Sequence, residues 1–248
     1  MSEEMLFRTE DDVLTITVNR PEVMNAVDGP MLHAAADAVE QTQARVIVIT
    51  GSGRAFGAGA DLNRVKEGGT QEGGNRLVRA MLSTPRPVVA AVNGPAAGIS
   101  ASVALAADFT VAHESAYFLQ AFINIGLMPD GGGTQLVAAS LGRARANRMA
   151  MLGERLPAAE AAEAGLIEAC LADEEYPDGV VALVKRLASG PTAAYAETKA
   201  ALNAVTLAGI DETLQRELDG QERLGSTDDF HEGVTAFLAK RPATFEGR

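Results

Sequence analysis

Two short apolar segments, residues 45–50 and 88–92, constrain the fold of this chain most strongly. Both have the length of a strand, both are rich in β-branched residues, and neither alternates between apolar and polar positions. Strands of this kind are covered on both faces, as in parallel sheets flanked by helices. An alternating segment at 13–19 and a helical pattern at 28–43 precede them, so the chain opens as strand, helix, strand. The pattern therefore predicts an α/β fold, and by itself it favours a doubly wound parallel sheet.

The remaining patterns divide the chain into two regions. Helical patterns occupy 73–83, 143–152 and 158–165, and short strand-like segments occupy 109–113, 116–118 and 166–171. From residue 178 onward, four helical patterns follow one another without a strand, at 178–189, 191–207, 211–224 and 227–240. We therefore expect a mixed core at 1–190 and a helical region at 191–248, which either packs against other subunits or caps the core.

Charge and cysteine content limit the function classes. A formal net charge of −12 argues against a nucleic acid or an anionic membrane as partner, since both demand a basic surface. The single Cys170 excludes an internal disulfide and a cysteine-based zinc site, and no metal site is expected. No apolar run approaches the ~20 residues that span a bilayer, and the acidic first residues do not resemble a targeting segment. We expect a cytoplasmic protein with no membrane and no nucleic-acid partner.

Glycine-rich loops follow both buried strands. The first, 51–62, lacks the dinucleotide-binding pattern because Phe56 stands where glycine is needed, and it lacks the Lys-Ser/Thr pair of NTP-binding loops. In the second, the segment 98–102 differs from the nucleophile elbow of the hydrolases because Ser102 replaces the last glycine. Such turns still offer backbone N–H groups to a ligand at the ends of parallel strands. They predict either a ligand-binding edge or plain structural turns.

A single carboxylate, Asp130, stands in a third glycine-rich loop, 126–134. Pro129 precedes it and three glycines follow it, which holds it on a tight turn and allows close approach of a ligand. A helical pattern resumes at Thr134, so Asp130 is expected near a helix N-terminus, where the helix dipole would lower its pKa and burial would raise it. An Asp-Gly pair is also a common turn signal. The pattern alone leaves a functional carboxylate and a turn residue both open.

Five segments, in order along the chain, resemble the signatures of the crotonase superfamily, the enoyl-CoA hydratases and isomerases. They lie at 19–26, 54–62, 87–98, 125–134 and 232–242, and the resemblance covers nearly the whole chain. It implies a crotonase-like spiral of β-β-α units with a C-terminal α-helical trimerisation region, rather than a doubly wound sheet. It also implies an acyl-CoA thioester as substrate, no separate cofactor, and a homotrimer or a dimer of trimers.

The resemblance also assigns residues to a site. The thioester carbonyl would lie between the backbone N–H groups of Ala60 and Ile99, which would stabilise the enolate oxygen that forms when the neighbouring carbon loses a proton. Phe237 and Lys240 resemble residues that reach the CoA of a neighbouring subunit. The full set expected to bind the substrate is Met24, Ala58, Asp61, Leu62, Gly98, Phe122, Phe237 and Lys240.

Two positions depart from the family near the expected CoA phosphates. Val23 and Asn63 stand where relatives often carry basic residues. The nearby basic side chains that could compensate are Arg54, Arg64 and Lys66.

The acid–base positions separate the reactions of the family. Ser102 and Phe122 stand where hydratases carry two glutamates, and neither side chain performs acid–base catalysis at neutral pH. Asp130 matches the carboxylate of several double-bond isomerases, especially the phenylacetate-pathway type, and the nucleophile of aryl-CoA dehalogenases. The chain has no Trp and few aromatics to form an aryl cradle. We therefore expect a Δ3-Δ2 enoyl-CoA isomerase with Asp130 as proton shuttle. Hydratase activity on a 2-enoyl-CoA and a non-catalytic acyl-CoA binding protein are the alternatives.

Overall fold

The computed structural model describes residues 4–64 and 69–248. Its largest element is a six-stranded sheet in the order β1-β2-β3-β4-β6-β9, and a smaller sheet has the order β5-β7-β8. In the larger sheet β1 pairs antiparallel with β2, and every following pair is parallel. The strands are β1 (Met5–Glu10), β2 (Val13–Val18), β3 (Val46–Gly51), β4 (Val88–Val92), β5 (Ala96–Ala97), β6 (Phe109–His113), β7 (Tyr117–Leu119), β8 (Leu156–Pro157) and β9 (Ala169–Leu171).

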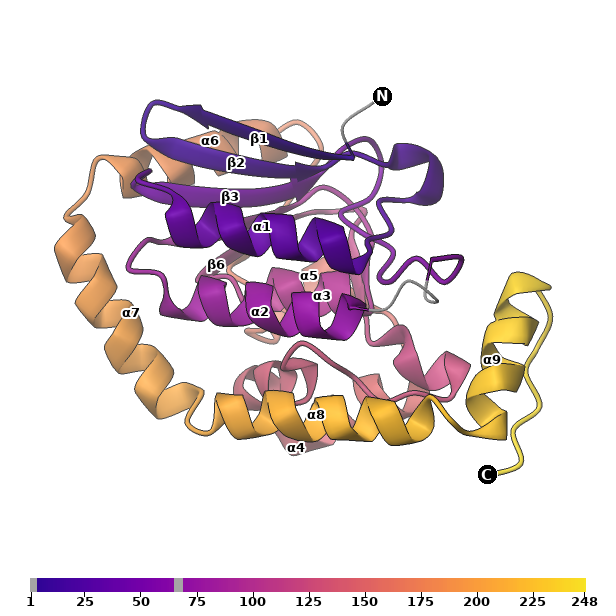
Figure 1. Ribbon diagram of the computed structural model, residues 1–248. Coiled ribbons are helices and arrows are strands. Elements are labelled where there is room, and N and C mark those ends of the chain that lie inside the picture. Colours follow the sequence, from indigo (N-terminus) through magenta and orange to yellow (C-terminus); the bar gives the residue numbers. More distant parts are fainter. Residues whose placement is uncertain (1–3, 65–68) are drawn as a thin grey trace.

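Helices cover both faces of the larger sheet (Figure 1). On one face Ile47 and Ile49 belong to the main core, to which α1 and α2 contribute. On the other face Val46 and Val48 pack with Leu187 of α6. The described helices are α1 (Gly29–Gln41), α2 (Thr70–Ser83), α3 (Ile99–Leu105), α4 (Gly133–Leu152), α5 (Ala158–Glu163), α6 (Tyr176–Ala188), α7 (Thr192–Thr206), α8 (Ile210–Leu224) and α9 (Asp228–Leu238), with short 3-10 turns at η1 (Pro21–Val23) and η3 (Ala121–Ile125). Burial of both faces explains why β3 and β4 are continuously apolar.

Successive turns of the chain alternate between the two sheets. β4 of the larger sheet leads to β5 of the smaller one and then to α3, and β6, β7 and α4 repeat that order. Isolated parallel bridges join Gly57 to Ala96 and Val27 to Ala60. The preceding turns of the chain therefore pair in the same parallel way. This is the spiral of β-β-α units, not the doubly wound sheet that periodicity favoured. β5, the second strand of the first of these units, has only two residues and leaves no periodic pattern.

The C-terminal helices curve around the core (Figure 1, orange to yellow). Lys199 anchors α7: its Nζ donates to the Met81 carbonyl at 2.6 Å and pairs with Asp108 at 2.8 Å. α8 contacts α2 and α4, and α9 packs against η3. The expected division at 190 falls in the link between α6 and α7. The role of this region in trimerisation stays a prediction.

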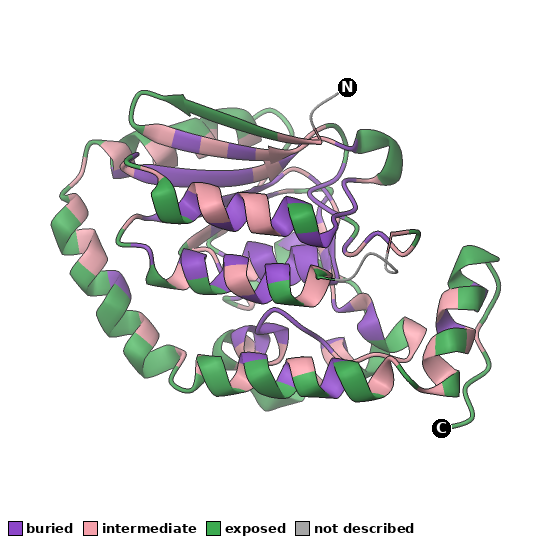
Figure 2. Ribbon diagram, viewed as in Figure 1, coloured by how far each residue is buried: buried purple, intermediate pink, exposed green. Residues whose placement is uncertain are grey.

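Several element boundaries differ from the sequence patterns. Asp28 is the N-cap of α1 and accepts a hydrogen bond from the Met31 N–H at 3.0 Å, so the helix begins after it. The patterns on either side of Gly142 form one helix with a break, because Gly142 has φ 72° and ψ 167°. β1 was not expected, and Figure 2 shows it almost wholly exposed at the sheet edge. An edge strand without a buried face carries no alternating signal.

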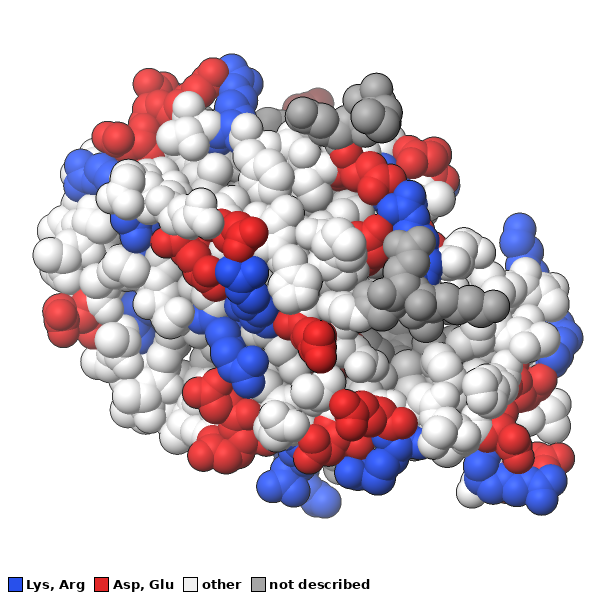
Figure 3. Space-filling view, viewed as in Figure 1, with Lys and Arg blue, Asp and Glu red and all other residues white. Residues whose placement is uncertain are grey.

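The surface carries charges of both signs. On the face seen in Figure 3, Lys and Arg side chains are interspersed with Asp and Glu among uncharged residues. Within residues 4–64 and 69–248, no helix has the length and apolar character needed to cross a bilayer.

Candidate active site

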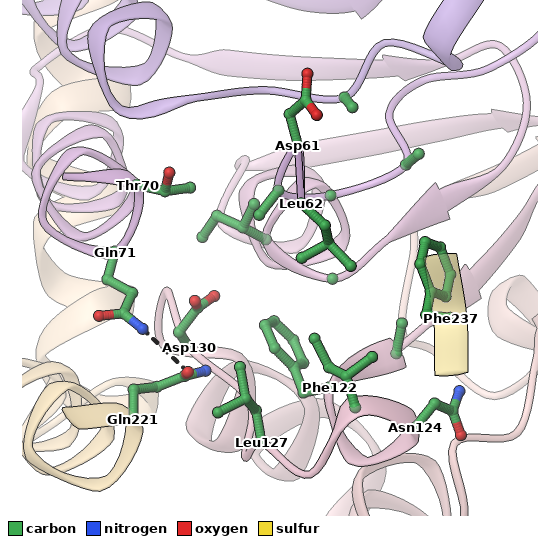
Figure 4. A pocket seen from close by; sticks show the side chains of 18 of the residues that line it. Asp61, Leu62, Thr70, Gln71, Phe122, Asn124, Leu127, Asp130, Gln221 and Phe237 are labelled. Atoms are coloured by element: carbon green, nitrogen blue, oxygen red, sulfur yellow. Dashed lines mark hydrogen bonds between the residues drawn. The ribbon is translucent and has the colours of Figure 1, made fainter. Parts of the chain in front are cut away.

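A cavity of about 490 Å³ lies where the two glycine-rich turns, η3 and the helices α2, α8 and α9 meet. Most of its lining is apolar. The expected site residues that it brings together are Ala58, Ala60, Asp61, Leu62, Gly98, Ile99, Phe122, Asp130 and Phe237. The fold therefore gathers residues from four distant stretches of sequence around one cavity (Figure 4).

Two expected residues are not brought into this cavity. Met24 ends η1 in a left-handed conformation, φ 56°, with its carbonyl accepting from the Ala58 N–H at 2.9 Å, and Val23 lines the cavity instead. Lys240 is exposed beyond the end of α9. Phe237 lines the cavity of its own chain. Contacts of Phe237 and Lys240 with a neighbouring subunit's substrate stay predictions.

Two backbone N–H groups, those of Ala60 and Ile99, form a candidate site for stabilising an anion. Gly59 and Gly98 face each other closely: a Cβ on Gly59 would lie 3.5 Å from the Cα of Gly98 and 3.0 Å from the Ala97 carbonyl. Ala60 and Ile99 follow these glycines directly. Neither N–H has an acceptor among the described residues, and the Ile99 N–H is one of the free donors at the start of α3. This arrangement suits an oxyanion that forms between the two turns.

Backbone contacts fix the loop that carries Asp130. The Asp130 carbonyl accepts from the Ser102 hydroxyl at 2.7 Å and from the Gly133 N–H at 3.0 Å. Gly131 has φ 62°, and a Cβ there would lie 2.5 Å from Ile99 Cδ1, so only glycine fits. The loop is thus packed directly against the turn that offers the Ile99 N–H.

The Asp130 carboxyl is held in a desolvated position. Its residue is 6% exposed, and its Oδ1 is buried with no hydrogen-bond partner among the described residues. Burial raises the pKa of Asp130 to about 8, and the negative charge of Glu217 contributes to the rise. The sequence left open whether burial or the helix dipole would set the pKa of Asp130. In the structure the effect of burial prevails.

Glu217 explains why the helix dipole does not lower the pKa of Asp130. From α8 its carboxylate accepts from the Gly132 N–H at 2.7 Å, from the Thr134 N–H at 2.9 Å and from the Thr134 hydroxyl at 2.5 Å. It therefore takes the free donors at the start of α4. The sequence analysis missed Glu217, although the sequence contains a signal for it. Glu217 follows the fully buried Leu214 by three residues and therefore lies on the inward face of an amphipathic helix.

No acid–base group stands at the two positions where hydratases carry glutamates. Ser102 is fully buried and committed to the Asp130 carbonyl. The Phe122 ring lines the cavity, with Cζ 3.8 Å from the position of a Cβ on Gly98.

The second carboxylate of the cavity, Asp61, is already paired. It forms a salt bridge with Arg20 at 2.9 Å and accepts from the Asn63 N–H at 3.1 Å. Burial alone would raise the pKa of Asp61, but these hydrogen bonds hold it below its usual range. Figure 4 shows its side chain directed away from Asp130. A contact of Asp61 with the substrate stays a prediction.

The basic groups expected near CoA phosphates are only partly available. Arg64 binds Glu4 at 2.8 Å and Asp28 at 2.7 Å, so its charge is already neutralised. Lys66 lies outside the described residues. No group of three or more metal-ligating side chains occurs in the part of the chain that the structure describes.

The chemistry available at this cavity is proton transfer next to a carbonyl. Asp130 has a carboxyl that is free to take up a proton, and the Ala60 and Ile99 N–H groups are free to receive a negatively charged oxygen. The apolar walls exclude water and strengthen both interactions.

Comparison with known proteins identifies the family of the chain. The family model for enoyl-CoA hydratase/isomerase matches residues 8–248. The chain is 44% identical to a "probable enoyl-CoA hydratase" of Rhodobacter capsulatus, over 98% of this chain and 97% of that protein. It is 39% identical to the 1,2-epoxyphenylacetyl-CoA isomerase of Escherichia coli, over the full length of both.

A solved structure agrees equally well. The crystal structure of an enoyl-CoA hydratase from Mycobacterium avium subsp. paratuberculosis K-10 superimposes with a TM-score of 0.93 at 45% identity, covering 98% of this chain and 99% of that one. The relatives carry both hydratase and isomerase names. The chain belongs to the enoyl-CoA hydratase/isomerase family, the crotonase superfamily.

Proposed function

We propose that the protein is a Δ3-Δ2 enoyl-CoA isomerase in which Asp130 is the only base. One observation carries the proposal: Asp130 is the one carboxylate, among the described residues of the cavity, that is not already bound to a cation. Moving a double bond along an acyl chain needs one proton removed and one returned. A single carboxyl group performs both steps.

The reaction starts when Asp130 removes a proton from C2 of a 3-enoyl-CoA. The electron pair of that C–H bond moves toward the thioester, whose oxygen becomes negative, and the Ala60 and Ile99 N–H groups stabilise it. The resulting dienolate carries negative charge at both C2 and C4. Asp130 returns the proton to C4 while the C2=C3 double bond forms. The products are a 2-enoyl-CoA and the carboxylate regenerated in its starting state.

The raised pKa of Asp130 suits this role. The ionised form of a carboxyl group whose pKa is about 8 is a stronger base than an ordinary aspartate, and the share of Asp130 in that form grows as pH rises toward 8. Burial also slows exchange of that proton with solvent. The apolar wall at Phe122 keeps water from adding to the product.

A hydratase is the second candidate function, and the names of several relatives favour it. Hydration needs a positioned water molecule and a second acid–base group, and Ser102 and Phe122 supply neither.

A product assay separates the two functions. With 3-hexenoyl-CoA we expect 2-hexenoyl-CoA at a rate typical of enzymes, about 1 s⁻¹ or more. With 2-hexenoyl-CoA we expect 3-hydroxyhexanoyl-CoA at least about 100-fold more slowly, since one acid–base group is missing. Faster hydration than isomerisation would overturn the proposal. Tight binding of both thioesters with no turnover would favour a binding protein.

A further inference from the structure

Two glutamine side chains form a polar pair at one end of the cavity. Gln71, from the first turn of α2, donates from Nε2 to Gln221 Oε1 at 3.0 Å, and Gln221, from α8, donates from Nε2 to the Met128 carbonyl at 2.5 Å. Both line the cavity, and Gln221 is 2% exposed. Figure 4 shows the pair on one side of Asp130, with Phe237 on the opposite side.

The pair retains unused hydrogen-bonding groups. Each amide has two N–H donors and an oxygen that accepts two hydrogen bonds. Among the described residues the side chains make only the two bonds above, which leaves Gln71 Oε1, one N–H on each amide and one lone pair of Gln221 unpaired. A purely alkyl group in contact with the pair would displace water from these groups without replacing the hydrogen bonds that the water makes. A ligand atom that both donates and accepts would satisfy them.

The charge around the pair selects the kind of polar atom. Among the described residues that line the cavity there is no Lys or Arg, and the charged groups are Asp61 and Asp130. Glu217 lies one helical turn before Gln221 on the same face of α8 and is buried. A ligand carboxylate beside the pair would therefore meet no counter-ion among the described residues, which is costly in a buried site. A neutral oxygen meets no such cost.

We propose that Gln71 and Gln221 select acyl groups that carry a neutral oxygen substituent, such as a hydroxyl, beyond the carbons that react at Asp130. This inference rests on the proposed isomerase function and deepens it by naming the substrate class. Gln71 and Gln221 are specificity residues, because they touch the far part of the acyl group and not the reacting carbons.

Three substrates of equal chain length test the inference: 3-hexenoyl-CoA, its 6-hydroxy derivative, and the corresponding ω-carboxylate. For the wild-type protein we expect kcat/KM for the hydroxy substrate to exceed that for the alkyl substrate by about tenfold or more, and the carboxylate to be the poorest. In Gln71→Met, which keeps the length of the side chain and removes its amide, we expect the hydroxy-to-alkyl ratio to fall to about one.

Gln215→Met is the matched control, since Gln215 is exposed on α8 and its side chain donates to Asp219; it should keep the wild-type ratio. Circular dichroism of each variant checks its fold. An unchanged ratio in Gln71→Met, or a wild-type preference for the alkyl or the carboxylate substrate, overturns the inference while leaving the isomerase function intact. Failure of all three substrates to isomerise overturns both.

Discussion

Replacing Asp130 by Asn is expected to lower kcat for isomerisation of a 3-enoyl-CoA by about 10³-fold, because the amide cannot take up the C2 proton. The substitution keeps the size of the side chain. It also leaves the loop in place, since the Ser102 hydroxyl and the Gly133 N–H bind the backbone carbonyl of residue 130 and not its carboxyl. KM should change little. Steady-state kinetics with purified variants measure both constants.

Asp219→Asn is the matched control for this substitution. It removes a carboxylate of the same size from an exposed position on α8, where Asp219 accepts a hydrogen bond from the Gln215 side chain. It should retain wild-type kinetics. A kcat of Asp130→Asn within a few-fold of the wild-type value would contradict the role of Asp130 as base.

The same substitution is expected to stabilise the protein increasingly as pH rises from about 4 to about 8. Asp130 has a pKa of about 8 in the folded protein, against an ordinary value of 3.8 that applies in the unfolded chain. Between these values the folded state holds a proton that the unfolded chain has lost, so wild-type stability falls by about 1.4 kcal/mol per pH unit from this group. Below pH 4 the group is neutral in both states. Above pH 8 it is charged in both, and the full cost of burying the charge remains.

Urea denaturation of the wild type and of Asp130→Asn at pH 5 and at pH 8 measures this effect. The difference in the free energy of unfolding between the two proteins isolates Asp130 from the other titrating groups, and it should favour the variant by several kcal/mol more at pH 8 than at pH 5. Asp219→Asn should show a difference that does not change with pH. A stability difference independent of pH for Asp130→Asn would show that the carboxyl is not desolvated in the folded protein.

Most helices and the buried strands could be predicted from the sequence. β4 and β6 occupy the predicted residues, and in β4 a continuous apolar run bounded by turn residues leaves little choice of length. The spiral could not be predicted from periodicity. β5 contains two residues, and its neighbour in the preceding turn is a single bridge at Gly57. Only the resemblance of whole motifs indicated the arrangement.

The candidate site, like the fold, could be predicted from the sequence only in part. The Asp130 loop and the two N–H turns are local motifs, and the sequence predicted all three. Glu217 and the glutamine pair were missed because they depend on contacts between distant elements: Gly132 and Glu217 are 85 residues apart, and Gln71 and Gln221 are 150 apart. The pKa of Asp130 was undecided for the same reason, since it depends on how deeply distant elements bury the carboxyl group and on the nearby charge of Glu217.

One measurement tests the single-base mechanism most directly. A 3-enoyl-CoA deuterated at C2 is converted in ordinary water, and the 2-enoyl-CoA product is examined for deuterium at C4. Because one buried carboxyl group both removes and returns the proton, we expect a substantial share of the label at C4 after a single turnover. Complete loss of the label to solvent, at an undiminished rate of isomerisation, would contradict a shuttle by Asp130 alone.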